Sequence, residues 1–308
     1  MATNKLIKIN KGDTIALTVM SSIVGDFNQV DSFVKMLQKE GYKVKCGECI
    51  YSKDGFLAGT DQKRANELMS FFLDDEIKGI LCYKGGYGAQ RILPYLDFEE
   101  IKKHPKLLMG FSDVTVLLNT LNQFANMPTV HGEMGVCMSE YDDFTYNHLF
   151  KVLSDGPTGE LRNQQNEAIC FKEGIVEAEL VGGNLSLIYA LMGTRYEIDL
   201  KDKILFIEDV DEAAYSIDRM LSSLILSGKM NQLKGLIGGY FTNCSSYKGV
   251  KVEEVLKRNL KDFNFPILLN FESGHSKPFI NLPIGQIVKL DATNKVVTAL
   301  ESLYQQDK

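Results

Sequence analysis

Apolar and polar residues alternate in blocks along the first 150 positions, and the blocks predict strands and helices in turn. Short apolar runs typical of buried strands lie at residues 13–20, 42–46, 78–83, 106–111 and 127–130. Apolar residues recur at helical spacing at residues 28–40, 61–75, 112–124 and 146–153, and residues 89–101 suit a helix broken by Pro94. This alternation predicts a mostly parallel sheet with flanking helices.

The pattern changes after residue 155. Residues 156–175 are rich in Gly, Pro, Asn and Gln and lack sustained periodicity, which is typical of a linker. Strand patterns follow at 175–181, 203–207, 235–241 and 266–270, with a hairpin over 286–300 and helices after residue 184, at 214–226 and at 252–260. We expect an N-terminal α/β domain at 1–155, a linker at 156–175 and a smaller, β-rich α/β domain at 176–308.

Length and composition agree with a globular chain of two domains. The chain has 308 residues, of which 44% are hydrophobic and 24% are charged. No apolar run approaches the roughly eighteen residues that a membrane-spanning helix needs, and no convincing secretion signal is seen. We therefore expect a cytoplasmic protein with no membrane partner.

The charge pattern argues against nucleic acid as a partner. The net charge is -6, and lysines and acids are interspersed, whereas a nucleic-acid surface needs clustered basic residues. A small or peptidic substrate fits better. Of the six cysteines only Cys46 and Cys49 are close in sequence, and they lack the further ligands of a zinc site and the following helix of a redox motif.

The segment Gly110–Asp113, with the sequence GFSD, joins a predicted buried strand to a predicted helix. At such a turn Ser112 can project from the sheet edge as a nucleophile, with helix N–H groups beside it to hold negative charge. Alternatively Ser112 merely caps the helix. Asp113 favours the first helical turn in both interpretations.

A glycine-rich turn, residues 84–88 with the sequence KGGYG, follows the predicted strand at 78–83. Three glycines in four positions allow unusual backbone angles and the close approach of a ligand. The spacing does not match a dinucleotide-binding motif. The turn is therefore either a tight structural connection or part of a binding site.

A serine nucleophile needs a base, and a third group to orient that base. Of four histidines, loop placement favours His131 and His275. Glu208 directly follows the apolar run at 204–207, so its carboxylate emerges from the end of a buried strand and needs a partner, which a histidine would supply. Acidic neighbours at 209, 211 and 212 lack the spacing of a calcium loop, and we expect no metal.

Five segments, in order, resemble the LD-carboxypeptidase family of serine peptidases, which includes muramoyltetrapeptide carboxypeptidases and microcin-immunity hydrolases. They are GTDQKRANELMSFFLDDEIKGILCYKGGYGAQRILPYLD, MGFSDVT, VGGNLSLI, LFIEDVDEAAYSIDRML and GHSKPFINLPIG. The resemblance spans about residues 13–290, and the joint order is more specific than any one motif. It favours the nucleophile interpretation of Ser112 over the cap.

The resemblance implies a Ser-His-Glu triad. Ser112 matches the family nucleophile in the motif G-[YF]-S-D, Glu208 matches the triad acid, and His275 matches the general base in G-H-x-x-P. It also implies an oxyanion hole made of the backbone N–H groups of Gly86 and Asp113, which need no side chain for this task.

Substrate contacts are expected from Lys84, Gly85, Tyr87 and Asn184. Family members commonly have Arg where this chain has Lys84. The planar guanidinium, which can bind a carboxylate through two N–H groups, is thus replaced by the compact charge of an ammonium group. The first loop, residues 21–25, also lacks the usual proline. Both departures concern the substrate rather than the triad.

The implied architecture places Ser112 in the N-terminal domain and Glu208 and His275 in the C-terminal domain, with the active site in the cleft between them, usually in a homodimer. The implied reaction is hydrolysis of the amide between an L-centre and a terminal D-amino acid, such as D-alanine on a murein tetrapeptide, during cytoplasmic murein recycling. It implies neither a metal nor an organic cofactor.

Two alternatives remain at this stage. A microcin-immunity-type hydrolase cleaves the amide of peptidyl or aminoacyl nucleotide analogues with the same triad, although that subgroup tends to be longer than 308 residues. A non-catalytic two-domain peptide-binding protein would use Ser112 only as a helix cap.

Overall fold

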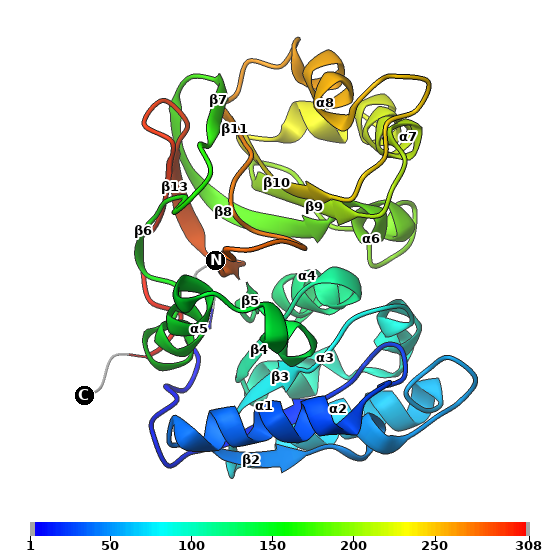
Figure 1. Cartoon of the computed structure of the whole chain (residues 1–308), viewed down its shortest axis with the longest axis vertical. Coiled ribbons are helices and arrows are strands. Elements are labelled where there is room, and N and C mark those ends of the chain that lie inside the picture. Colours follow the sequence, from blue (N-terminus) through cyan, green and yellow to red (C-terminus); the bar gives the residue numbers. More distant parts are fainter. Residues whose placement is uncertain (1–3, 306–308) are drawn as a thin grey trace. The chain divides into compact units, whose positions relative to one another are not determined.

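The computed structural model describes residues 4–305, which form two compact α/β units. Unit 1 contains residues up to 157, together with residues 281–285 and residues from 302 onward, and unit 2 contains residues 158–280 and 286–301. Each unit has its own sheet and its own flanking helices (Figure 1). The two-domain α/β fold expected from the sequence is thereby confirmed.

Unit 1 is built on a six-stranded sheet in the order β12-β5-β4-β3-β1-β2. All neighbouring pairs are parallel except β12 and β5, which are antiparallel. The strands are β1 (Thr14–Thr18), β2 (Lys43–Cys46), β3 (Ile77–Cys82), β4 (Leu107–Gly110), β5 (Thr129–His131) and β12 (Leu282–Ile284).

The helices of unit 1 bury apolar stripes at the spacing that the sequence predicts. Pro94 prevents a continuous helix after the glycine turn, because proline lacks the N–H that a helix interior needs, and the segment divides into a 3-10 turn and a short helix. The helices are α1 (Phe27–Lys39), α2 (Asp61–Leu73), α3 (Phe98–Lys103), α4 (Thr115–Ala125) and α5 (Asp143–Asp155), with 3-10 turns η1 (Glu48–Tyr51), η2 (Ala89–Tyr95), η3 (Ser112–Val114) and η4 (Gly135–Glu140).

Unit 2 is built on an eight-stranded mixed sheet in the order β6-β14-β13-β8-β9-β10-β11-β7. The central strands β8 to β11 are parallel, and the strands on both sides of them are antiparallel to their neighbours. The strands are β6 (Gly159–Leu161), β7 (Ile169–Lys172), β8 (Ile175–Asn184), β9 (Ile204–Val210), β10 (Gly235–Thr242), β11 (Ile267–Leu269), β13 (Ile287–Asp291) and β14 (Val296–Ala299).

Three helices cover the parallel strands of unit 2 and close its apolar core. They are α6 (Leu185–Leu191), α7 (Ala214–Leu226) and α8 (Val252–Leu260), with a 3-10 turn η5 (Lys229–Gln232). Figure 1 shows α7 and α8 side by side beyond β9 and β10. Ile207, Ile217 and Leu256 are among the buried residues of this core. Within residues 4–305 no helix is long and apolar enough to cross a membrane.

The segment expected as a linker, 156–175, is instead mostly part of unit 2. The boundary follows Pro157, and the segment supplies the outer strands β6 and β7. The loop between them is fixed by the fully buried Glu272, whose carboxylate accepts N–H groups from Gln165 at 2.9 Å and Asn166 at 2.6 Å. Periodicity could not reveal this, because the partner lies more than a hundred residues away.

The sheet topology brings loops that are distant in sequence to the same edge. In a parallel sheet the carboxyl ends of neighbouring strands lie together. In unit 1 the loops after β1, β3 and β4 are therefore neighbours. In unit 2 the ends of β8, β9, β10 and β11 are neighbours in the same way.

Candidate active site

Ser112 lies at a sharp turn directly after β4. Its φ of 61° is in the left-handed region, which costs a non-glycine residue about 1–3 kcal/mol. Neither η3, which begins at Ser112, nor the following α4 has a side-chain cap. Ser112 is therefore not a helix cap, and its strand-to-helix turn is of the kind that exposes a nucleophile.

The glycine turn after β3 lies against this serine. A β-carbon on Gly85 would lie 3.0 Å from Cβ and 3.2 Å from Oγ of Ser112, and 3.3 Å from the backbone nitrogen of Asp113. The next residue, Gly86, has a φ of +118°. Glycine at position 85 therefore keeps open the space over the serine oxygen and the Asp113 N–H.

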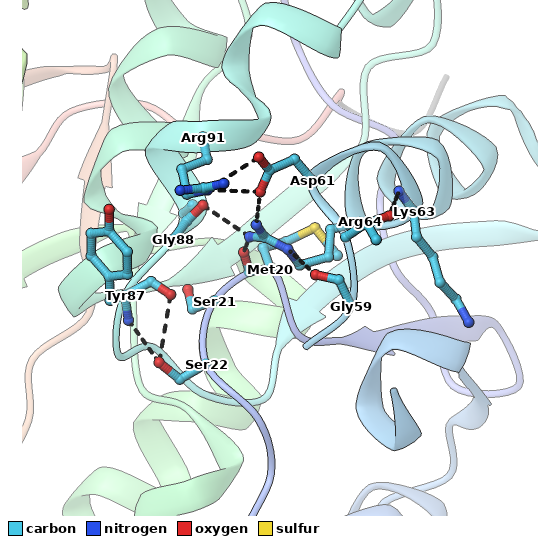
Figure 2. A network of polar contacts seen from close by, with 12 residues as sticks. Met20, Ser21, Ser22, Gly59, Asp61, Lys63, Arg64, Tyr87, Gly88 and Arg91 are labelled. Atoms are coloured by element: carbon cyan, nitrogen blue, oxygen red, sulfur yellow. Dashed lines mark hydrogen bonds and ion pairs between the residues drawn. The ribbon is translucent and has the colours of Figure 1, made fainter. Parts of the chain in front are cut away.

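The first loop of unit 1 is attached to the glycine turn at two points. The Lys84 ammonium donates to the carbonyl oxygen of Ile23 at 2.8 Å, and burial lowers the pKa of this ammonium. The Tyr87 N–H donates to Ser22 Oγ at 3.0 Å (Figure 2). The two places at which the sequence departs from the family pattern thus contact each other, while Tyr87 stays 44% exposed.

A buried arginine beneath the glycine turn was missed by sequence reasoning. The Arg64 guanidinium is fully buried and donates to the carbonyl oxygens of Gly88 at 2.9 Å and Gly59 at 3.2 Å, and to that of Met20. Asp61 accepts from it at 2.5 Å (Figure 2). The arginine thereby connects the residue before the first loop, the segment before α2 and the glycine turn.

The Asp113 side chain does more than favour the first turn of a helix. It is buried, and its Oδ2 accepts hydrogen bonds from Ser21 Oγ at 2.6 Å and from the Ala89 N–H at 2.7 Å. Burial raises the pKa of this carboxyl group, and the hydrogen bonds oppose that shift. Asp113 thus contacts the first loop and Ala89, the residue directly after the glycine turn, through one oxygen.

In unit 2 the predicted acid and base are in direct contact. His275 Nδ1 lies 2.7 Å from Glu208 Oε2, with the Glu208 side chain fully buried and the His275 side chain 19% exposed. A carboxylate accepts hydrogen bonds, so Nδ1 carries the proton and Nε2 has the lone pair of a general base. Within residues 4–305 the second Glu208 oxygen has no hydrogen-bond partner.

Gly274 allows this pair to form. Its φ is +125°, and a β-carbon there would lie 2.9 Å from Glu208 Oε2. Changing Gly274 to alanine is expected to displace the carboxylate from His275 and to lower kcat by roughly tenfold to a hundredfold. Initial rates would measure the loss.

The matched control for this change is Gly249→Ala. Gly249 also has a positive φ, +83°, but among residues 4–305 no heavy atom other than those of its chain neighbours lies within 4 Å of its β-carbon position. It shares the backbone strain without the contact to the carboxylate. Equal losses of kcat in the two variants would contradict the role given to Gly274.

Asn184, expected to contact substrate, lies buried at the end of β8. Its side-chain oxygen accepts from the Leu187 N–H and caps α6, and its side-chain nitrogen donates to Asp209 Oδ1 at 3.0 Å. Asp209 in turn accepts from the N–H and hydroxyl of Ser186, each at 2.9 Å. Burial, followed by the nearby charge of Glu208, raises the pKa of Asp209 to about 6.

The other candidate residues lie in packed surroundings. His131, the second histidine favoured by loop placement, is fully buried in β5 and packs edge-on against Phe111, with 5.7 Å between ring centroids. Burial raises the pKa values of Cys46 and Cys49, which lowers their reactivity. Among residues 4–305, no group of three or more His, Cys, Asp or Glu side chains could hold a metal ion.

Comparison with known proteins places both halves of the chain in one family. Residues 15–132 match the model of the LD-carboxypeptidase N-terminal domain, and residues 177–290 match that of the LD-carboxypeptidase C-terminal domain. The "Probable murein peptide carboxypeptidase" of Bacillus subtilis is 37% identical over 296 residues, which cover 93% of this chain and 91% of the relative.

Two solved structures resemble the whole chain. A crystal structure of muramoyltetrapeptide carboxypeptidase from Oxalobacter formigenes has a TM-score of 0.80 and 26% identity, covering 92% of this chain and 97% of that one. A structure of MccF in complex with glutamyl sulfamoyl guanosine has a TM-score of 0.89, covering 98% and 99%; at 24% identity this match concerns the fold alone.

Unit 1 places Gly85 and the Asp113 N–H at Ser112, and unit 2 pairs Glu208 with His275, each within a segment that matches its half of the same family. The two matched segments together include well over half of the 308 residues. The chain therefore belongs to the LD-carboxypeptidase family of peptidases.

Proposed function

We propose that this protein is a serine-type LD-carboxypeptidase, which hydrolyses the amide between an L-centre and a terminal D-amino acid in murein peptides. Ser112 is the nucleophile, His275 the general base and Glu208 the acid that orients the base. The observation that carries the proposal is the 2.7 Å contact between His275 Nδ1 and a fully buried Glu208. Such a pair is what a serine needs for activation.

The proposed reaction has two halves. Ser112 Oγ attacks the carbonyl carbon while its proton moves to His275 Nε2, and the oxyanion binds to the N–H groups of Gly86 and Asp113. The C–N bond then breaks, and His275 returns the proton to the leaving amine of the D-amino acid. Water, deprotonated by His275, hydrolyses the resulting ester and releases Ser112.

Glu208 has two tasks in this reaction. It holds the histidine with the proton on Nδ1, and it stabilises the imidazolium that forms when Nε2 accepts the serine proton. A carboxylate in water would do this weakly, whereas a fully buried one interacts strongly with a nearby cation because the local dielectric is low. The working enzyme must bring Ser112 Oγ within hydrogen-bond reach of Nε2.

The substrate class rests on the relatives. The relative at 37% identity is named for murein peptides, and the structure at 26% identity is a muramoyltetrapeptide carboxypeptidase. We therefore propose a murein tetrapeptide ending in D-alanine as substrate, turned over in the cytoplasm by a homodimer. Lys84, Gly85 and Tyr87 remain the proposed substrate-binding residues, whereas the buried Asn184 side chain binds the Leu187 N–H and Asp209.

A second candidate function is supported by a relative, the "Microcin C7 self-immunity protein MccF" of Escherichia coli, which is 26% identical over 96% of this chain and 96% of the relative. In this alternative the same triad cleaves the amide of a peptidyl or aminoacyl nucleotide analogue. Both candidates share the chemistry of the attacked carbonyl and differ in the leaving group.

A direct assay separates the candidates. The purified protein would be incubated with a murein tetrapeptide ending in D-alanine, with the same peptide ending in L-alanine, and with an aminoacyl sulfamoyl nucleotide. Chromatography is expected to show release of D-alanine from the first peptide only, and full activity in excess EDTA. Cleavage of the nucleotide analogue alone would refute the murein assignment, and no cleavage at all would favour a non-catalytic binding protein.

A further inference from the structure

The Asp113 carboxylate joins the carboxyl ends of three neighbouring strands. Asp113 itself follows β4, Ser21 follows β1 and Ala89 follows β3, and these strands are adjacent in the order β4-β3-β1. One carboxylate oxygen accepts from both partners, at 2.6 Å and 2.7 Å. Hydrogen bonds to an ionised acceptor are about twice as strong as neutral ones, so this oxygen is a firm connection between the three loops.

Arg64 binds the glycine turn through a backbone carbonyl oxygen of that turn. Its guanidinium donates to Gly88 O at 2.9 Å, one residue before the Ala89 N–H that binds Asp113 (Figure 2). Asp61 orients the guanidinium and is itself bound by Arg91 at 2.9 Å. The peptide between residues 88 and 89 is thus bound at its C=O by a cation and at its N–H by an anion.

The buried charges of Arg64 and Asp113 also offset each other beside the proposed oxyanion hole, where a negative charge would develop during the reaction. A buried carboxylate near an oxyanion is unfavourable, because like charges repel strongly at low dielectric. Arg64 and Asp113 are both at most 1% exposed, and they attract each other. A buried charge of each sign leaves the turn with little net charge to oppose the oxyanion.

We propose that the Asp113 carboxylate is a positioning residue, which with Arg64 as its counter-charge fixes the glycine turn against the serine turn so that the N–H groups of Gly86 and Asp113 converge on one oxygen. This inference rests on the proposed function, because it assigns a geometric task within that oxyanion hole. Donors fixed in advance need no reorganisation during the reaction, which is the main source of their catalytic effect.

The test uses three variants of graded severity. Asp113→Asn keeps an acceptor oxygen but loses the charge and is expected to lower kcat by about tenfold, and Asp113→Ala loses both and is expected to lower kcat by about a hundredfold. Ser21→Ala removes one donor and leaves the Ala89 contact, with an expected loss below that of Asp113→Asn. KM for the tetrapeptide is expected to change less than about threefold throughout, since the oxyanion forms only in the transition state.

Asp97→Asn is the matched control. Asp97 caps α3 in the same unit by accepting from the Glu100 N–H at 3.0 Å. The Asp97→Asn variant therefore loses one negative charge, as Asp113→Asn does, but at a position away from the oxyanion donors. Its kcat is expected to equal that of the wild type. Thermal unfolding would be measured for every variant, and rates would be expressed per folded enzyme. Loss of thermal stability without loss of kcat in the Asp113 variants would overturn the proposal.

A second readout separates this inference from the substrate assignment. A fluorophosphonate reacts when Ser112 Oγ bonds to phosphorus, fluoride leaves and the serine proton passes to the base, and its phosphoryl oxygen uses the same N–H donors. The labelling rate is expected to fall in the order Ser21→Ala, Asp113→Asn, Asp113→Ala even if the tetrapeptide is not the substrate. If Asp113→Ala were labelled as fast as the wild type, the positioning role would be refuted. If the wild type were labelled but did not cleave the tetrapeptide, only the murein assignment would be refuted.

Discussion

Replacing Ser112 by alanine is expected to lower kcat for D-alanine release from a murein tetrapeptide by about a thousandfold or more. The change removes one oxygen atom, and with it the nucleophile. Neither η3 nor α4 depends on a side-chain cap, so no helix loses a hydrogen bond. The thermal midpoint is therefore expected to stay within about 2 °C of the wild-type value.

Ser154→Ala is the control for this prediction. Ser154 lies on α5 in the same unit, where its hydroxyl donates to Lys151 O at 3.2 Å, and its loss is expected to leave kcat unchanged. The double variant Ser112→Ala with His275→Ala should lose little more than either single variant, because a base without a nucleophile has no task. Additive losses, or full activity of Ser112→Ala, would rule out the proposed triad.

Changing Glu208 to glutamine is expected to lower kcat by about a thousandfold to ten-thousandfold. Glutamine has almost the shape of glutamate, but its NH₂ group can donate to His275 Nδ1. That contact would stabilise the tautomer with the proton on Nε2, which cannot accept a proton from serine. The imidazolium would also lack the buried charge that stabilises it. The fluorophosphonate labelling rate of Ser112 should fall with kcat.

The control tests whether the reaction needs the Glu208 carboxylate itself or only the negative charge of the acidic cluster at residues 208, 209, 211 and 212. Asp211 lies three residues beyond Glu208, is exposed, and has a φ of 57° that asparagine also tolerates. Asp211→Asn is expected to retain wild-type kcat. A comparable loss in both variants would mean that the negative potential of the cluster, rather than the contact with His275, supports the reaction.

The order and type of most elements could be predicted from the sequence because their signals are local. The apolar stripe of α1 and the run of β9 need no distant partner to be recognised. The strands β6 and β7 could not be recognised in this way, since the sheet and the buried Glu272 that hold them come from residues far along the chain. β12 was hidden for the same reason, within a motif noted only for its histidine.

The candidate site was predictable to the extent that its residues stand in short motifs. Such motifs led to the proposal of Ser112, Glu208 and His275 as the triad. They could not reveal the partners of the Asp113 side chain, because these partners follow two other strands. For Arg64 a signal was available. It precedes Leu68 by four residues on the buried side of α2, and an arginine at such a position needs buried acceptors.

The path of the chain between the two units has a consequence for its synthesis. The partner of β5 at the edge of the unit 1 sheet is β12, residues 282–284, and Leu6 near the start of the chain exchanges backbone hydrogen bonds with Leu303 and Gln305. A nascent chain that has only reached residue 280 therefore holds the serine-bearing sheet with an open edge, which is prone to pair with other chains. Unit 1, although most of its residues precede those of unit 2, completes its folding only after residues 282–284 and 303–305 have left the ribosome.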